Sequence, residues 1–321
     1  MNIKKEKLHR EGRTGQNRPT IWKKAKRTYN ILTMAKKPLE QEKRMKYKII
    51  CDSSANLLPG MFPEDDIVSF ANVPLSIFVG SKAYCDDGTA DVPEMMDRII
   101  HTNDKTTTSC PSPNEYLKEM TGADYYIVIT ISSKLSGSYN SAYLAKTSHE
   151  KPENVFVLDS LLTAGAMELM AEEAYRLAHQ DIPFDQLCDK LVSYRKNVNL
   201  LFVLDKFDNL IKMGRVSKVV GFIAKKFKIK PLCCGENGEI KIKEKVRTIQ
   251  GVLKRLIVNI GLVCPDQKGR KCIISHTNAE KSVDYLKGEI EKNYHFDSVI
   301  VRKNNALCSF YAMQGGLIVA F

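Results

Sequence analysis

The feature that most constrains the fold is a regular alternation of short apolar runs with longer amphipathic segments, which begins with YKIICDSS. This run at 47–54, and those at 124–132 and 154–160, are rich in β-branched and aromatic residues, as buried strands are. The segments 136–150 and 163–179 follow two of them and have the pattern of helices. Strands joined through helices pair in parallel, so this half of the chain predicts a parallel sheet covered by helices.

The second half of the chain predicts a mixed sheet. In the segment PLCCGENGEIKIKEKV, Asn237-Gly238 separates two strand-like runs and is a strong hairpin signal. We predict helices at 184–198, 207–231 (interrupted near Gly214), 247–261 and 279–293, and strands at 199–206, 271–277, 297–303 and 316–321. The predicted fold class is therefore α/β with two α/β domains. Residues 46–205 form the first, with a mostly parallel sheet, and residues 206–321 form the second, with a mixed sheet.

The positive charge of the chain is confined to its beginning. The net charge is +12, and residues 1–48 contain 16 Lys and Arg against 4 Asp and Glu, which leaves 33 of each sign in the remainder. We expect residues 1–45 to be a basic extension that is disordered or loosely helical. It is either a tail, including one from a start codon placed too far upstream, or an arm that contacts nucleic acid or an anionic membrane. Because the body is neutral, nucleic-acid binding is not the favoured interpretation.

Several functional classes lack their sequence signals. There is no uninterrupted apolar run of about 18 residues and no secretory signal, so no transmembrane segment is predicted. The nine cysteines form no C-x-x-C pair, which indicates reduced thiols in a cytoplasmic protein rather than a disulfide framework or zinc site. The phosphate-binding and dinucleotide-binding glycine motifs are absent, and the six histidines show no metal-ligand spacing. We therefore predict no cofactor and no metal.

Hydroxyl side chains gather where the predicted strands end. The stretch TISSKLSGSYNSAYLA contains six of them around one glycine, and Thr106–Ser109, Asp52–Ser54 and Asp159-Ser160 are similar clusters. Ligands of open α/β sheets bind at the carboxyl ends of the strands. Small hydroxyls and amides at helix starts suit a carboxylate or phosphate, so we expect a shared anion site. The alternatives are that each cluster only caps a helix, or that Ser136 is a catalytic nucleophile.

The motifs IICDSSANLLP, TSCPSPNEYLKEM, ITISSKLSGSYNSA and DNLIKMGRVSK together resemble the DegV family of bacterial lipid-binding proteins, over about residues 46–321. The resemblance implies two α/β domains that hold one long-chain fatty acid in a tunnel at their interface. It implies that hydroxyls and amides of the TSCPSP and LSG motifs anchor the carboxylate, with further residues near the head group. The implied ligand-binding residues are Thr108, Ser109, Ser136, Gly137, Ser138, Arg215 and Tyr311. Such proteins perform no chemistry themselves; they present the acyl carboxylate to a separate fatty acid kinase for phospholipid synthesis.

The chain departs from the family pattern at several positions. The family usually ends in a His-x-Gly-Pro-Gly signature, for which this chain has Tyr311, Met313 and Gln314 at the histidine, first glycine and proline. Thr163 and Met167 likewise replace a serine and a glycine of the family. A phenol can donate a hydrogen bond to a carboxylate, but it cannot carry the positive charge of an imidazolium. We expect the fold to keep lipid binding.

Two other functions stay open from the sequence. A serine hydrolase or acyltransferase would use Ser136 as nucleophile, although no nucleophile-elbow motif and no identifiable base accompany it. A nucleic-acid-associated protein would use the basic extension.

Overall fold

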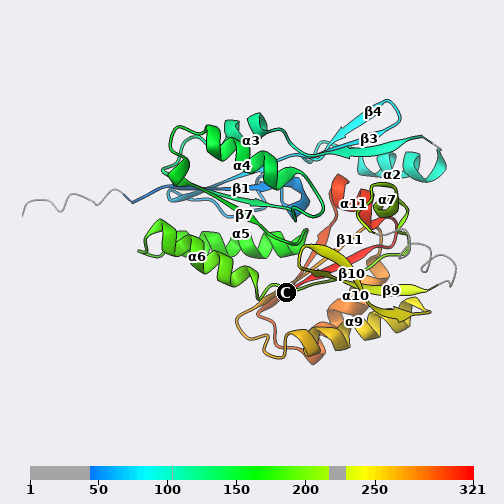
Figure 1. The fold of residues 1–321 in the computed structure, drawn as a ribbon. Coiled ribbons are helices and arrows are strands. Elements are labelled where there is room, and N and C mark those ends of the chain that lie inside the picture. Colours follow the sequence, from blue (N-terminus) through cyan, green and yellow to red (C-terminus); the bar gives the residue numbers. More distant parts are fainter. Residues whose placement is uncertain (1–43, 103, 217–228) are drawn as a thin grey trace, which may run out of the picture. The chain divides into compact units, whose positions relative to one another are not determined.

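The computed structural model describes residues 44–102, 104–216 and 229–321. Nearly all of the predicted basic extension, and most of the second part of the predicted helical segment 207–231, lie outside these ranges. The described strands form sheets of four, six and three strands (Figure 1). None of the helices in the described ranges is both long and apolar enough to cross a membrane.

The four-stranded sheet is entirely parallel, with the strand order β2-β1-β6-β7. Its strands are β1 (Tyr47–Asp52), β2 (Val68–Val73), β6 (Tyr125–Thr130) and β7 (Val155–Asp159). The helices α3 (Pro113–Glu119) and α4 (Ser138–Ser148) pack on one face, where Ile50 is buried. Helix α5 (Gly165–Ala178) packs on the other face against Ile49, and α6 (Phe184–Arg195) packs against α5. The predicted parallel sheet covered by helices is confirmed.

The three-stranded sheet is antiparallel, and its strands come between β2 and β6 along the chain. It consists of β4 (Lys82–Cys85), β3 (Ser76–Val79) and β5 (Thr106–Ser109). Two helices share its core, namely α2 (Val92–His101) and α11 (Ala306–Ala312). The sequence predicted neither β5 nor α11. Strand β5 forms because Thr107 and Thr108 pair with β3, in a segment that looked only like a hydroxyl cluster.

The six-stranded sheet is mixed, as predicted, with the order β10-β9-β8-β13-β11-β12. Its strands are β8 (Leu200–Val203), β9 (Lys230–Glu236), β10 (Glu239–Val246), β11 (Lys271–His276), β12 (Ser298–Lys303) and β13 (Leu317–Ala320). Only β11 and β12 pair in parallel. The turn between β9 and β10 has positive φ angles of 51° at Asn237 and 83° at Gly238, so the predicted hairpin is confirmed. The helices α9 (Ile249–Val263) and α10 (Glu280–Asn293) cover one face.

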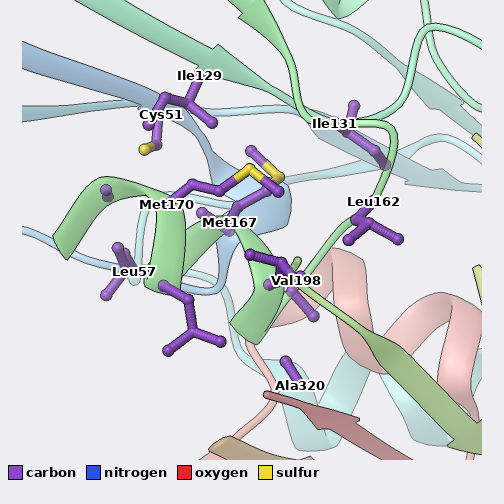
Figure 2. Close-up of a cluster of buried hydrophobic side chains, with 14 of the residues drawn as sticks. Cys51, Leu57, Ile129, Ile131, Leu162, Met167, Met170, Val198 and Ala320 are labelled. Atoms are coloured by element: carbon purple, nitrogen blue, oxygen red, sulfur yellow. The ribbon is translucent and has the colours of Figure 1, made fainter. Parts of the chain in front are cut away.

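Helix α5 contacts the two larger sheets at once. It packs on β1 and β6 of the parallel sheet and on β11 and β13 of the mixed sheet. Figure 2 shows its residues Met167 and Met170 in one cluster with Cys51 and Ile129 of the first sheet and Ala320 of the second. A helix that is buried on two sides needs apolar residues around most of its surface, which explains its Ala/Met/Leu-rich sequence. The boundary that we predicted between 46–205 and 206–321 stays a prediction, and β8 precedes it although it pairs within the mixed sheet.

Candidate functional site

A cavity of about 360 Å³ lies where segments from both halves of the chain meet. This volume is within the range of small-molecule sites in proteins, roughly 300 to 1,000 Å³. Most of the wall is apolar and includes Leu162, Leu200, Phe202, Leu210 and Ile318. These residues come from the loop after β7, from β8 and β13, and from the short helix α7 (Asp208–Lys212). The cavity therefore suits a largely apolar ligand.

Polar side chains contribute a smaller part of the wall. Six of the seven predicted site residues line the cavity, namely Thr108, Ser109, Ser136, Gly137, Arg215 and Tyr311. They come from β5, from the loop before α4, from the segment after α7 and from α11. The seventh, Ser138, is fully buried and is not among the lining residues. Contact of these residues with a ligand stays a prediction.

Thr108 and Tyr311 form a polar contact between the two halves of the chain at this site. The Thr108 Oγ1 and Tyr311 Oη atoms lie 2.8 Å apart, and either hydroxyl can donate. Tyr311 stands on α11, which packs against the three-stranded sheet that contains Thr108. The Tyr311 phenol therefore reaches the predicted head-group region. It offers a hydrogen bond there but no positive charge.

The loop before α4 brings Ser136 and Gly137 to the same region. The Cys110 Sγ atom is 3.0 Å from the position that a Cβ atom would take at Gly137, so this loop lies directly against the chain that leaves β5. Ser136 is half-buried, and its Oγ accepts a hydrogen bond of 3.3 Å from the Ser138 amide. The Oγ atoms of Ser136 and Ser138 are 3.0 Å apart. Ser138 thus forms a second layer of hydroxyl behind the cavity wall.

The other hydroxyl clusters at the strand ends bond within the protein. The Ser132 Oγ donates to the carbonyl of Gly238 at 2.7 Å, and the Ser160 Oγ donates to the carbonyl of Leu162 at 2.9 Å. Ser54 donates to the side chain of Asp52. None of the three serines lines the cavity. The expectation of one anion site shared by all clusters is therefore wrong, because these groups satisfy buried polar atoms and fix loops instead.

Two buried aspartates lie behind the site. Asp52 accepts from the amides of Ser54 and Ile131, at 3.1 Å and 2.8 Å, and burial raises its pKa to about 6 although these hydrogen bonds oppose the rise. Burial also raises the pKa of Asp86 to about 6. The Ser53 hydroxyl and the first amides of α11 favour its charged form, but within the described residues neither oxygen has a partner at hydrogen-bond geometry. Two acids in this position make the region sensitive to protonation.

Arg215 is the cation of the predicted set. It lines the cavity and is half-buried, and its Nε atom is buried without a hydrogen-bond partner among the described residues. It follows Gly214, which has a φ of +68° and lies just after the C-cap residue of α7, Met213. The last two residues of the motif DNLIKMGRVSK, Ser217 and Lys218, lie outside the described residues. A guanidinium in the wall gives the cavity one positive charge that an anionic head group could approach.

The site offers no arrangement for nucleophilic catalysis in the described part of the chain. The hydrogen-bond partner of the Ser136 hydroxyl is another serine, with no histidine or lysine bonded to it. Within the described residues there is also no group of three or more His, Cys, Asp or Glu side chains that could hold a metal ion. The geometry provides an apolar cavity with hydroxyl side chains that can donate hydrogen bonds in one part of its wall.

Comparison with known proteins identifies relatives along most of the chain. The family model described as "Uncharacterised protein, DegV family" matches residues 46–321. A DegV domain-containing protein of Streptococcus pyogenes serotype M3 is 34% identical over 284 residues, which cover 86% of this chain and 99% of that protein. One from Streptococcus pneumoniae strain R6 is 31% identical over 281 residues, with 86% and 99% covered.

Solved structures agree with this assignment. The S. pneumoniae Fatty Acid Kinase (Fak) B3 protein loaded with linoleic acid matches with a TM-score of 0.80 and 31% identity, over 86% of this chain and 99% of that one. A DegV family protein from Eubacterium eligens loaded with heptadecanoic acid matches with a TM-score of 0.78 and 28% identity, over 85% and 98%. The protein TM841 of Thermotoga maritima, whose structure reveals fatty acid binding function, has a TM-score of 0.73 and 27% identity, over 86% and 98%. The predicted resemblance and fold class are confirmed.

Proposed function

The chain belongs to the DegV family, and from this membership we propose that it binds one long-chain fatty acid in the cavity between its two halves. The acyl chain occupies the apolar part, and the carboxylate accepts hydrogen bonds from Thr108, Ser109, Ser136 and Tyr311, with the Gly137 amide and Arg215 nearby. The observation that carries the proposal is an apolar cavity whose wall also holds these small donors. Fatty acids bound to relatives of similar fold support it.

The energetics suit a binding protein. Burying about fourteen methylenes contributes on the order of 11 kcal/mol at roughly 0.8 kcal/mol each, before the cost of association is subtracted. A carboxylate that enters with the chain loses its water and must find donors in the site. Neutral hydroxyls provide them and leave the carboxylate oxygens free of a tight ion pair, which suits an acid that must react afterwards.

We propose further that the chain is a carrier and not an enzyme. It presents the bound acid to a separate fatty acid kinase, and the acyl-phosphate formed there enters phospholipid synthesis in the cytoplasm. The similarity to the Fak B3 protein supports the kinase partner. The absence of a base bonded to Ser136 in the described residues supports the lack of hydrolase activity. A fluorophosphonate probe should therefore leave Ser136 unlabelled, and labelling would favour the hydrolase.

The test of fatty-acid binding is extraction of the purified protein followed by mass spectrometry. We expect close to one fatty acid per chain, and uptake of added palmitate by the delipidated protein. Ser136→Ala should lower palmitate affinity about tenfold, as expected for the loss of one hydrogen bond to a charged group. Ser148→Ala is the matched control, since Ser148 is exposed at the far end of α4. No bound fatty acid and no uptake of palmitate would contradict the proposal.

A second candidate function rests on the basic extension, in which residues 1–45 carry 14 Lys and Arg against 4 Asp and Glu, a balance of +10. Binding of DNA that falls steeply with salt, and that disappears when the chain is truncated to Met45, would support it. Fatty-acid binding should survive the same truncation, because every residue of the cavity wall follows position 45.

A further inference from the structure

The first motif of the chain, IICDSSANLLP, contributes no residue to the cavity wall. Its centre is a short 3-10 helix, η1 (Ser53–Ala55), which follows β1, and Asn56 ends this helix with a φ of +61°. The side chain of Asn56 is enclosed, because the residue is only 1% exposed, so its amide group needs hydrogen-bond partners inside the protein. It finds them in the second half of the chain.

Asn56 bonds to the segment that joins β12 to α11. Its Oδ1 accepts a hydrogen bond of 2.6 Å from the amide of Asn305, and its Nδ2 donates one of 2.9 Å to the carbonyl of Lys303. The partners are 249 and 247 positions away in the sequence. A side-chain amide that both donates to and accepts from one backbone segment fixes where that segment lies and how it is turned.

Helix α11 needs such a contact from outside. Asn305 is its N-cap residue, but the Asn305 side chain caps no amide of the helix. All seven residues of the helix except Tyr311 are buried, and the apolar contacts around Phe310 hold it without a preferred direction. At the other end, the Asn209 Nδ2 donates a hydrogen bond of 2.7 Å to the carbonyl of Phe310. Asn56 and Asn209 therefore fix the two ends of α11.

The position of α11 decides where the Tyr311 phenol lies. Tyr311 is less than two helical turns beyond Asn305, so a shift or rotation at the start of the helix carries through to its side chain. The Tyr311 Oη lies 2.8 Å from the Thr108 Oγ1, and a hydrogen bond of this length is lost when the two atoms move apart by less than 1 Å. The start of α11 must therefore be held in place for Tyr311 to stay against Thr108.

We propose that Asn56 is a positioning residue of the fatty-acid site, which sets the Tyr311 phenol against Thr108 and toward the head group by holding the start of α11. The inference rests on the proposed function, since the ligand is the fatty acid. Asn56 does not touch the ligand, because it is not on the cavity wall. It acts through Tyr311, so its effect on binding depends on that phenol.

The experiment is a double-mutant cycle of Asn56→Gly and Tyr311→Phe, in which calorimetry gives the affinity of the delipidated proteins for palmitate. Glycine adopts a φ of +61° without strain, so Asn56→Gly removes the side chain and keeps the backbone. In the chain with Tyr311, it should lower the affinity about three- to tenfold, as the loss of the Tyr311 hydroxyl does. In the Tyr311→Phe chain, it should lower the affinity by less than about twofold, because the group that Asn56 positions is already missing.

The matched control is Asn237→Gly, at a position with a φ of +51° that is not on the cavity wall. This variant should leave the palmitate affinity unchanged. Hydrogen exchange of the Asn305 amide adds a measurement that needs no ligand. Exchange should be at least about tenfold faster in Asn56→Gly than in the wild type, because the acceptor of this amide is gone.

A milder variant, Asn56→Asp, covers the case that Asn56→Gly does not fold. It keeps an acceptor for the Asn305 amide and loses the donor to the Lys303 carbonyl, so it should lower palmitate affinity at least about twofold, again only in chains with Tyr311. An equal loss of affinity with and without the Tyr311 hydroxyl would mean that Asn56 supports the fold in general. Unchanged affinity would mean that packing alone holds α11, and either result overturns the inference. If the wild-type chain binds no palmitate, the proposed function fails and the inference with it, which differs from binding that does not depend on Asn56.

Discussion

The substitution Gly235→Ala tests whether the apolar wall sets the length of the acyl chain. Gly235 stands in β9 at the cavity wall, and a Cβ atom added there would lie 2.5 Å from Cδ2 of Leu162. Carbon atoms in contact are normally about 3.5 to 4.0 Å apart, so Leu162 has to move by about 1 Å or more. The surrounding core is closely packed, and the cavity is the open space beside Leu162. The substitution should therefore shorten the cavity.

The expected effect depends on ligand length. If the displaced Leu162 side chain takes the place of one methylene, the longest fatty acid that fits loses about 0.8 kcal/mol of binding free energy. This corresponds to a Kd about fourfold higher. A shorter chain that does not reach this part of the wall loses nothing. The assay is displacement of a fluorescent fatty acid by myristate, palmitate and stearate, with the ratio of their Kd values as the readout.

The matched control for this experiment is Gly288→Ala. Gly288 lies in α10, and no atom is found within 4 Å of an added Cβ there. We expect this variant to leave all three Kd values unchanged. In Gly235→Ala, an equal change for the three acids would indicate a general disturbance of the fold. Kd values that match those of the wild type for all three acids would show that Leu162 does not limit the length of the acyl chain. Either result refutes the reasoning.

Three further predictions concern the head group, an ion pair and pH. Tyr311→Phe removes the phenol that bonds to Thr108 and should lower palmitate affinity about three- to tenfold in calorimetry; unchanged affinity would exclude this hydroxyl from the site. Arg302→Ala removes the 2.7 Å ion pair of Glu168, which is 2% exposed, and should lower the free energy of unfolding in urea by about 3 kcal/mol. The control is Lys287→Ala, which breaks an exposed ion pair with Glu291 and should lower it by less than about 0.5 kcal/mol. The two buried aspartates with a pKa of about 6 make the ligand-free folded state bind more protons than the unfolded state. Their stabilisation is complete below about pH 4 and is lost as the pH rises through 6, by roughly 1 kcal/mol each between pH 5 and 7. Burial lowers the pKa of His276, which acts in the opposite direction in the same pH range, so the readout is the comparison with Asp52→Asn and Asp86→Asn. A loss of stability between pH 5 and 7 as large in these variants as in the wild type would contradict this.

Much of the fold was predictable because its signals are local. The parallel sheet follows from buried runs such as DYYIVITIS that alternate with helices, and the hairpin follows from Asn237-Gly238, whose residues adopt the positive φ angles that this turn needs. The specific motifs around Thr108 and Ser136 identified the family. By contrast, α11 was missed, because its seven residues have no capping side chain and are almost all buried, so no amphipathic period is visible.

The site was predictable only in part. Motif residues led to six positions on the cavity wall, and their contact with a ligand stays a prediction. The apolar wall could not be predicted, since Leu162, Leu200, Phe202 and Ile318 lie in different elements and look like ordinary core residues in the sequence. Ser138 is likewise indistinguishable in sequence from Ser136, two positions away, yet one is buried behind the other.

By itself, then, the sequence determined the type of each major strand and helix, because the spacing of apolar residues reports which face of an element is buried. It does not report what that face packs against. Only the tertiary structure decided that α5 lies against both sheets, that Asp52 is fully buried, and that Tyr311 meets Thr108 across 203 positions of the chain. These contacts join residues far apart in sequence, and they form only when all the elements pack together.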